Sequence, residues 1–190
     1  MTTASVSTVE ALQLPRAGSW QIDPSHSSVA FSVRHLGLSK VRGQFASFTG
    51  ALSVLEPAEL SSVVVSIEVD SIDTREPARD GHLKSPDFLD AAEHPTLTFA
   101  SRTVTGGGSH WEVEGDLTIK GISRPVTLDV TYEGAATDPW GGSRIAFSAS
   151  TEIDREDWGM TYNQALEAGG WLVGKKVKIE LEVEAVHQEG

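Results

Sequence analysis

Short stretches in which apolar and polar residues alternate run through most of this chain. In residues 28–35, Val29, Phe31 and Val33 fall on one face of a strand, and serines and Arg34 fall on the other. Such alternation is typical of strands that are buried on one face only. The other segments of this kind cover residues 44–54, 63–70, 96–102, 110–119, 126–132, 144–151 and 177–183.

The number and spacing of these segments predict an all-β fold. About eight short antiparallel strands are typical of a sandwich or of an up-and-down barrel. Hairpin signals, such as Lys120–Gly121, join many of them, so sequential strands are expected to pair. An eight-stranded barrel either fills its interior with side chains or holds one small ligand. Alternation alone does not separate these two cases.

One long segment, residues 71–95, interrupts the alternation with charged, helix-like sequence. Ser85, Pro86 and Asp87 are residue types that favour a helix N-cap and first turn. We therefore expect a short helix to begin there and to end before Pro95. Long loops on rigid β scaffolds often form lids or binding loops, which makes this insertion a candidate for ligand contact.

Composition narrows the classes of function. The 190 residues fit a single domain over residues 18–190 after a flexible N-terminal tail over residues 1–17. The 15 basic and 27 acidic residues give a net charge of −12. This balance argues against nucleic-acid binding and disfavours adhesion of the chain to anionic membranes. There are no cysteines, so disulfides, thiolate catalysis and zinc–thiolate sites are excluded.

The sequence shows neither a targeting signal nor a catalytic motif. No segment approaches the roughly 20 apolar residues of a spanning helix, and the first residues lack the pattern of a secretory signal. A cytoplasmic location without an integral membrane segment is therefore expected. The six histidines are dispersed without metal-ligand spacing, so no metal site is expected. Neither a nucleophile elbow nor a phosphate-binding glycine loop is present in the sequence.

Several motifs resemble those of one family. They are WQIDPSHSSVAFSVRHLGLSKVRGQFASFTG from Trp20, SIDTREPARDGHLKSPDFLDAAEHPTLTF from Ser71, GDLTIKGISRPVTL from Gly115, DREDWGM from Asp154 and GKKVKIELEVEA from Gly174. In this order they resemble the motifs of the YceI-like family of polyisoprenoid-binding, lipocalin-like proteins. The resemblance covers roughly residues 19–186.

The resemblance implies a fold and a class of ligand. The fold is an eight-stranded antiparallel lipocalin-like barrel with a short helical insertion around residues 75–93. The ligands are long amphiphiles held in the barrel, such as polyprenyl chains, quinones or fatty-acid derivatives, and a homodimer is a family-level expectation. The chain departs from the family in two respects: many members are exported, and Trp158 stands where Phe is usual, which predicts a differently shaped pocket.

The inward residues of the strands are expected to form either plain core or the wall of a ligand cavity. Phe88 and Leu89 of the insertion are expected to meet this cavity. Trp158 and Tyr162 belong to a second non-strand segment, residues 154–174, which forms either a rim or a packed surface loop. The residues expected at the cavity are Phe31, Val33, His35, Phe45, Val65, Ile67, Phe88, Leu89, Phe99, Leu117, Ile119, Phe147, Trp158 and Tyr162.

Three cationic side chains are candidates for contacting a ligand headgroup: Arg79, His82 and Arg155. Arg79 and His82, with Asp80, either fix the insertion onto the barrel by hydrogen bonds or clamp an anionic headgroup. His35 either contacts a headgroup or bonds to a nearby backbone carbonyl.

These features predict a protein that carries or sequesters a long-chain amphiphile of polyisoprenoid, isoprenoid-quinone or fatty-acyl type without catalysis. No cofactor is expected besides a bound lipid such as a polyprenyl phosphate or quinone. One alternative is an enzyme that acts on such a lipid through His82 with Asp80, or through His35. Another is a stress-response protein whose cavity is incidental.

Overall fold

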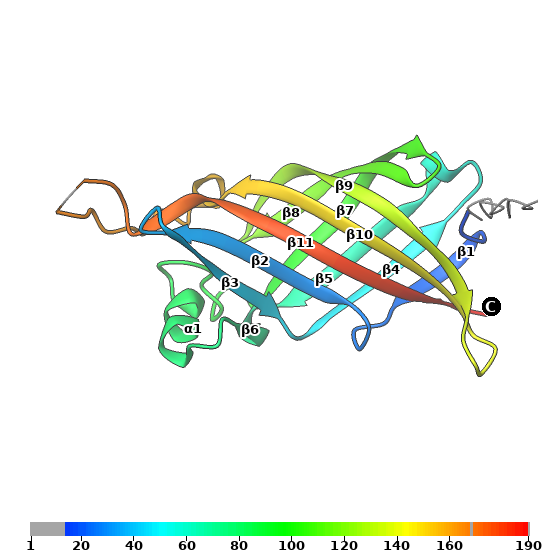
Figure 1. The fold of residues 1–190 in the computed structure, drawn as a ribbon, viewed down its shortest axis with the longest axis horizontal. Helices are drawn as coiled ribbons and strands as arrows, with labels where there is room; N and C mark the ends of the chain where they lie inside the picture. Colours follow the sequence, from blue (N-terminus) through cyan, green and yellow to red (C-terminus); the bar gives the residue numbers. More distant parts are fainter. Residues whose placement is uncertain (1–13, 168, 190) are drawn as a thin grey trace, which may run out of the picture.

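The structure is a computed structural model that describes residues 14–167 and 169–189. The expected tail over residues 1–17 falls mostly outside these ranges. The described chain forms one elongated barrel with a short α-helix at one end (Figure 1). Its strands are β1 (Gly18–Ile22), β2 (Ser28–His35), β3 (Ser39–Phe45), β4 (Phe48–Val54), β5 (Ser62–Glu68), β6 (Ile72–Asp73), β7 (Thr96–Gly107), β8 (His110–Ile119), β9 (Ile122–Thr137), β10 (Ser143–Asp154) and β11 (Val173–His187).

Eight strands close the barrel. Each is hydrogen-bonded to the next in the order β1–β4–β5–β7–β8–β9–β10–β11, and β11 returns to β1. All the pairings are antiparallel, and β2, β3 and β6 extend the sheet from β11. The predicted eight-stranded antiparallel barrel with a short helical insertion is therefore confirmed. Closure also removes the exposed strand edges that an open sheet would leave.

Two breaks divide what would otherwise be continuous strands. β1 and β2 lie one after the other along β11, since Ile22 pairs with Ala185 and Val29 pairs with Leu181. The single strand expected over residues 44–54 is likewise split, because β3 ends at Phe45 and β4 begins after two residues. β1 was not predicted at all, since five residues are too few to show a clear period.

The helix lies earlier in the insertion than predicted. α1 spans Pro77–Lys84, and Ser85 is its C-cap rather than an N-cap. The start is fixed by Pro77 in the first turn and by the Glu76 side chain, which accepts a hydrogen bond from the Ala78 N–H. Proline is well tolerated there because its missing N–H has no partner within a helix. The insertion contains two prolines that could each begin a helix, Pro77 and Pro86, and α1 begins at Pro77.

Shorter 3₁₀ turns complete the connections. They are η1 (Ala58–Leu60), η2 (Val69–Ser71) and η3 (Arg155–Trp158). η3 follows β10 directly and carries two buried side chains, Arg155 and Trp158. Among the described helices, none has the length and apolar character needed to cross a membrane.

The buried hydrophobic side chains of the described residues form three clusters. At the end that carries α1, Leu89, Trp158 and Met160 pack with inward residues of the strands. At the other end, Trp20, Tyr132 and Ile145 form a second cluster and are at most 2% exposed. The third cluster, Phe99, Val113 and Val130, belongs to the wall of the candidate site inside the barrel.

Candidate ligand-binding cavity

A cavity of about 630 Å³ lies inside the barrel. This volume is within the range of roughly 300–1,000 Å³ that is common for small-molecule sites. The barrel is therefore hollow rather than filled by its own side chains. Of the residues expected at the cavity, those that line it are Phe31, Val33, Phe45, Val65, Ile67, Phe88, Leu89, Phe99, Leu117, Ile119 and Phe147.

The apolar wall follows from strand periodicity. On β11, Val177, Ile179 and Leu181 line the cavity, and the alternate residues Lys178 and Glu180 are exposed. Successive side chains of a strand point to opposite faces, so a strand with this pattern can supply an apolar wall on one side only. An apolar wall of this kind gains free energy from any apolar ligand that displaces water from it.

Two glycines give the phenylalanine rings their room. A side chain at Gly43 would overlap the ring of Phe31, its cross-strand partner, and a side chain at Gly115 would overlap the ring of Phe99. Each ring therefore lies against bare backbone of the neighbouring strand. A larger residue at either glycine would have to displace the ring.

The insertion and η3 close one end of the cavity. Leu83, Phe88 and Leu89 reach the lining from the insertion, and Arg155 and Met160 reach it from η3 and the residue pair that follows. At the other end, the lining includes Leu14 and Leu55, whose side chains are 56% and 43% exposed. The cavity therefore reaches the surface beside the connection between β4 and β5.

Arg155 is a charged group in an otherwise apolar end of the cavity. The residue is 3% exposed and lines the cavity. Its Nε donates to the carbonyl of Gly174 at 3.0 Å, and Nη1 donates to the carbonyl of Met160. Its guanidinium carbon lies 5.9 Å from the centre of the Phe88 ring. Nη2 is buried and has no hydrogen-bond partner among the described residues.

The charge of Arg155 lacks a close counter-ion. No carboxylate of the described residues lies within ion-pair distance of it, although Glu156 and Asp154 act on it from farther away. Burial lowers the pKa of Arg155, which shows the free-energy penalty of holding this charge away from water. The other buried polar atom without a partner in the described chain is the neutral hydroxyl of Tyr132. Arg155 is therefore the place where a ligand acceptor would be stabilised most.

The other two headgroup candidates lie outside the cavity lining. Arg79 donates to the hydroxyl and the carbonyl of Thr74, both at 2.8 Å. Asp80 accepts from the hydroxyl and the N–H of the same threonine, at 2.5 and 2.9 Å. Thr74 is 4% exposed, so these contacts fasten α1 to the chain that follows β6. This is the arrangement expected of residues that fix the insertion onto the barrel.

His82 is paired with Asp87 and not with Asp80, the partner expected in the enzyme alternative. Its Nε2 lies 2.9 Å from Asp87, and both side chains are substantially exposed. The imidazole also packs edge-on against Phe88 and Tyr162. Asp80 bonds to Thr74 instead, as described above. The histidine thus belongs to the outer surface of the insertion.

Three residues expected at the cavity lie elsewhere. His35, the last residue of β2, is not part of the lining, although its partner Val173 on β11 is. Tyr162 packs on His82 and Phe88 on the outside of the closed end. Trp158 is 2% exposed but is directed into the core, where its indole N–H donates to the carbonyl of Leu117 at 3.1 Å. A buried Trp needs such a partner, and Trp158 belongs to the core cluster rather than to the cavity lining.

Sequence reasoning missed some lining residues. Ile22 and Phe48 line the cavity from strands next to the two breaks, where the alternating pattern is interrupted. Met160 lies in a loop and has no periodic signal. Val113 and Val130 could have been included, because the alternation on their strands already places them inward.

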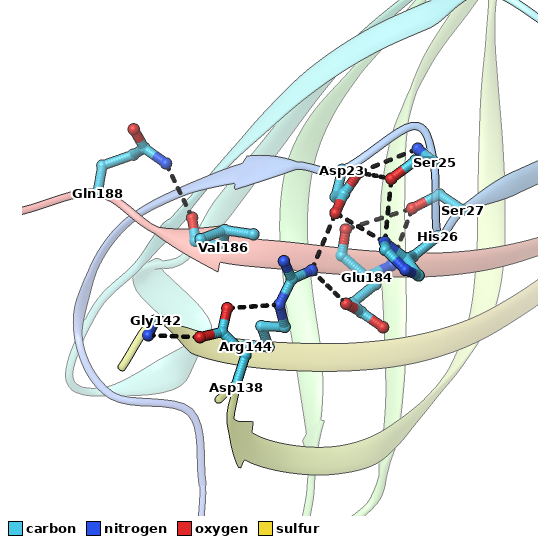
Figure 2. A network of polar contacts seen from close by, with 10 residues as sticks. All are labelled: Asp23, Ser25, His26, Ser27, Asp138, Gly142, Arg144, Glu184, Val186 and Gln188. Atoms are coloured by element: carbon cyan, nitrogen blue, oxygen red, sulfur yellow. Dashed lines mark hydrogen bonds and ion pairs between the residues drawn. The ribbon is translucent and has the colours of Figure 1, made fainter. Parts of the chain in front are cut away.

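A polar network holds the break between β1 and β2 (Figure 2). Arg144 of β10 bonds to Asp23 at 2.9 Å, to Asp138 at 3.1 Å and to Glu184 of β11. His26 also bonds to Asp23, at 2.9 Å. Hydrogen bonds from Ser25, then from Arg144 and His26, hold the pKa of Asp23 well below its usual range. Arg144 places its positive charge among three carboxylates and so joins β10 to β11 and to the residues that follow β1 and β9.

Comparison with known proteins identifies the family. The family model described as the YceI-like domain matches residues 20–185. The chain belongs to the YceI-like family. Among YceI-like relatives, a UPF0312 protein of Vibrio cholerae serotype O1 is 38% identical over 167 residues, covering 86% of this chain and 84% of the relative. A UPF0312 protein of Staphylococcus aureus is 40% identical over 164 residues, covering 85% of this chain and 94% of the relative.

Solved structures share the YceI-like fold. The Campylobacter jejuni YCEI protein has a TM-score of 0.70 at 28% identity, with 82% of this chain and 90% of that chain covered. BcnA of Burkholderia cenocepacia has a TM-score of 0.75 at 23% identity, covering 86% and 98%. A polyisoprenoid-binding domain of Saccharophagus degradans, implicated in plant cell wall breakdown, has a TM-score of 0.70 at 12% identity, covering 91% and 100%. The last two likenesses concern the fold.

Proposed function

We propose that this YceI-like protein binds a long-chain amphiphile in its barrel and carries or sequesters it without chemical change. The observation that carries the proposal is the buried Arg155 at the closed end of an apolar cavity. The Saccharophagus degradans domain of similar fold is a polyisoprenoid-binding domain, which supports the same class of ligand. The chain of the ligand would lie along the apolar wall, and its head would meet the guanidinium.

The apolar wall favours length rather than a particular chain. Each buried CH₂ contributes about 0.8 kcal/mol, so affinity grows roughly fourfold with each methylene that enters the cavity. Polyisoprenoid, isoprenoid-quinone and fatty-acyl chains all meet this requirement. Selectivity among chains of similar length is therefore expected to be low.

The buried guanidinium favours a head that accepts hydrogen bonds. Nη2 of Arg155 has no partner among the described residues, and an acceptor there would satisfy it. An anionic head, such as a phosphate or carboxylate, would also balance the charge that burial penalises. A quinone carbonyl would satisfy the N–H but leave the charge uncompensated. We therefore place an anionic head above a neutral one.

Paired ligands test this arrangement. Palmitic acid and 1-hexadecanol have the same chain length and differ at the head, and Trp111 in the cavity wall reports binding by its fluorescence. The native protein should bind palmitate about 10–100-fold more tightly, because a hydrogen bond to a charged group contributes roughly 1.5–3 kcal/mol. Arg155→Met should remove this difference and leave the affinity for hexadecanol nearly unchanged.

Controls separate the head from the cavity. Arg124→Met changes an exposed arginine on β9 and should keep the preference for palmitate. If Arg155→Met fails to fold, Arg155→Lys, which retains the positive charge, takes its place in the comparison of palmitic acid with 1-hexadecanol. Equal binding of both ligands by the native protein would contradict the role of Arg155. Failure of the native protein to bind either ligand would contradict the proposed function itself.

A further inference from the structure

One hairpin concentrates positive charge in an acidic chain. Residues 24–55 contain no aspartate or glutamate, although the whole chain has a net charge of −12. The strands β2 and β3 lie within this stretch, and they carry Arg34, Lys40 and Arg42 as exposed side chains. None of the three forms an ion pair within the described residues.

The register gathers these cations on the outer face of the sheet. Arg34 lies directly opposite Lys40, and Ser32 lies between Arg42 on one side and Lys178 of β11 on the other. Like charges placed opposite each other on neighbouring strands destabilise a sheet. The pairing of Arg34 with Lys40 is therefore unfavourable for the fold alone and suits a surface that meets an anionic partner.

In contrast to the hairpin cations, two lysines of the neighbouring strand β11 form ion pairs. Lys178 bonds to Glu180 at 2.8 Å, and Lys175 bonds to Glu156 at 2.7 Å. Their charges are already balanced locally. Lys40 and Arg42 also help to lower the pKa of Glu180, after Lys178, but from beyond ion-pair distance. The hairpin cations therefore have no ion-pair partner among the described residues and are available to an external one.

The tip of the same hairpin is apolar. Three residues, 36–38, join β2 to β3. Leu36 and Gly37 have φ angles of 55° and 70°, and Leu38 is 81% exposed. The left-handed conformation of Leu36 is unfavourable for leucine, and Leu38 is not buried. The fold alone therefore does not explain why leucines stand at the tip. The Leu36 N–H donates to the carbonyl of Leu172, which places the tip beside Trp171, itself 57% exposed. Figure 1 shows the hairpin tip and this loop at the same end of the barrel.

We infer that this end of the protein docks on an anionic phospholipid bilayer. Leu36, Leu38 and Trp171 enter the headgroup region, where amphipathic aromatic and apolar side chains are favourable. The hairpin cations Arg34, Lys40 and Arg42 contact lipid phosphates at the surface of the bilayer. The basic charge and the protruding apolar tip together fit a bilayer. A nucleic acid would use the charge alone and leave the leucines in water.

The acidic balance of the whole chain does not oppose this docking. The Debye length is about 8 Å at physiological ionic strength, so a bilayer responds mainly to the face presented to it. A second copy of the chain fits this surface less well. In a two-fold interface the same patch meets itself, which would bring the hairpin cations of two protomers together.

The docking surface adjoins the closed end of the cavity. The loop that carries Trp171 begins after Met160, which lines the cavity, and includes Tyr162, which packs on Phe88. Docking would thus bring the end that holds Arg155 to the membrane. The inference concerns a surface and goes beyond ligand binding, and either could fail without the other.

Vesicle sedimentation tests the docking. The full chain is mixed with vesicles of phosphatidylcholine alone, or of phosphatidylcholine and phosphatidylglycerol in a three-to-one ratio. We expect binding to the anionic vesicles that weakens as salt is added. Each cation near such a surface contributes about fivefold to partitioning, so the variant Arg34→Gln/Lys40→Gln/Arg42→Gln should bind roughly 100-fold more weakly. Leu38→Ser should lose about tenfold.

Matched variants separate the hairpin from the rest of the surface. The triple change Arg16→Gln/Arg102→Gln/Arg124→Gln removes the same charge from other exposed arginines, and Trp140→Ser removes a side chain that is 87% exposed elsewhere. Both should bind like the native protein. Absence of binding to anionic vesicles at low salt, or equal losses in the control and hairpin variants, would overturn the inference. A dimer in light scattering that Leu38→Ser dissociates, without vesicle binding, would overturn it in favour of a protein interface.

Discussion

Two arginines show how the same residue type serves different purposes in this fold. Arg144 lies among Asp23, Asp138 and Glu184, and their hydrogen bonds raise its pKa. Arg155 is buried against carbonyls and an aromatic ring, and desolvation lowers its pKa. The first is balanced by the protein itself and stabilises a strand break. The second is left for a ligand to balance, which is why we place the headgroup there.

The network around Asp23 predicts a dependence of stability on pH. The pKa of this carboxyl is lowered from its ordinary value of 3.8 in the folded protein, chiefly by Ser25 and then by Arg144 and His26. The ionised carboxylate therefore stabilises the fold fully above about pH 4, and this stabilisation is lost progressively as the pH falls further. Urea unfolding should show Asp23→Asn as less stable than the native protein near neutral pH.

The same comparison at acid pH provides the control. The difference in unfolding free energy between the native protein and Asp23→Asn should narrow from about pH 4 downward, because the Asp23 carboxyl then binds a proton in the unfolded chain while it stays ionised in the folded one. Asp129→Asn, an exposed residue on β9, should show no such trend. A difference that stays constant down to about pH 2 would contradict the assigned role of Asp23.

At the scale of elements, the insertion is held to the barrel by one small hydrogen-bonded cluster. The hydroxyl of Thr74 lies between Asp80 and Arg79, and the threonine is 4% exposed. Behind this cluster, Leu83 and Phe88 complete the cavity wall. The charged residues of the insertion thus position its apolar residues.

Removing that hydroxyl should loosen the insertion. Thr74→Val keeps the shape of the side chain but leaves Asp80 and Arg79 without one partner each, which costs about 1–3 kcal/mol in unfolding free energy. Thr98→Val, at an exposed position on β7, should change it by less than about 0.5 kcal/mol. Chemical denaturation measures both. Equal effects of the two substitutions would show that the cluster does not fasten the insertion.

The sequence predicted the strands better than the features that depend on tertiary contacts. Alternation located β2, β8 and the wall of the cavity, because a strand with one buried face has no other stable pattern. It could not locate the split between β3 and β4, which depends on how neighbouring strands bond. It also could not choose between Pro77 and Pro86 as the start of the helix. Arg155 was a candidate from its position in a motif, but only the structure reveals its buried, unpartnered N–H.

At the scale of the whole molecule, the barrel keeps a hollow interior that a tightly packed core would fill. A large apolar cavity forfeits packing free energy unless something occupies it. Eleven of the predicted wall residues surround this space, and it reaches the surface beside the connection between β4 and β5. A long apolar chain is the occupant that this shape and lining favour.

Identification of the occupant tests this account most directly. The protein, purified from cells without detergent, is extracted with organic solvent, and the extract is analysed by mass spectrometry. Val65→Phe narrows the cavity, whereas Val64→Phe changes the next residue on the outer face, which is 54% exposed. We predict a long-chain lipid with an acceptor headgroup from the native protein and from Val64→Phe, and a reduced yield from Val65→Phe. A native protein that yields no lipid, and takes none up from a membrane lipid extract, would contradict the account.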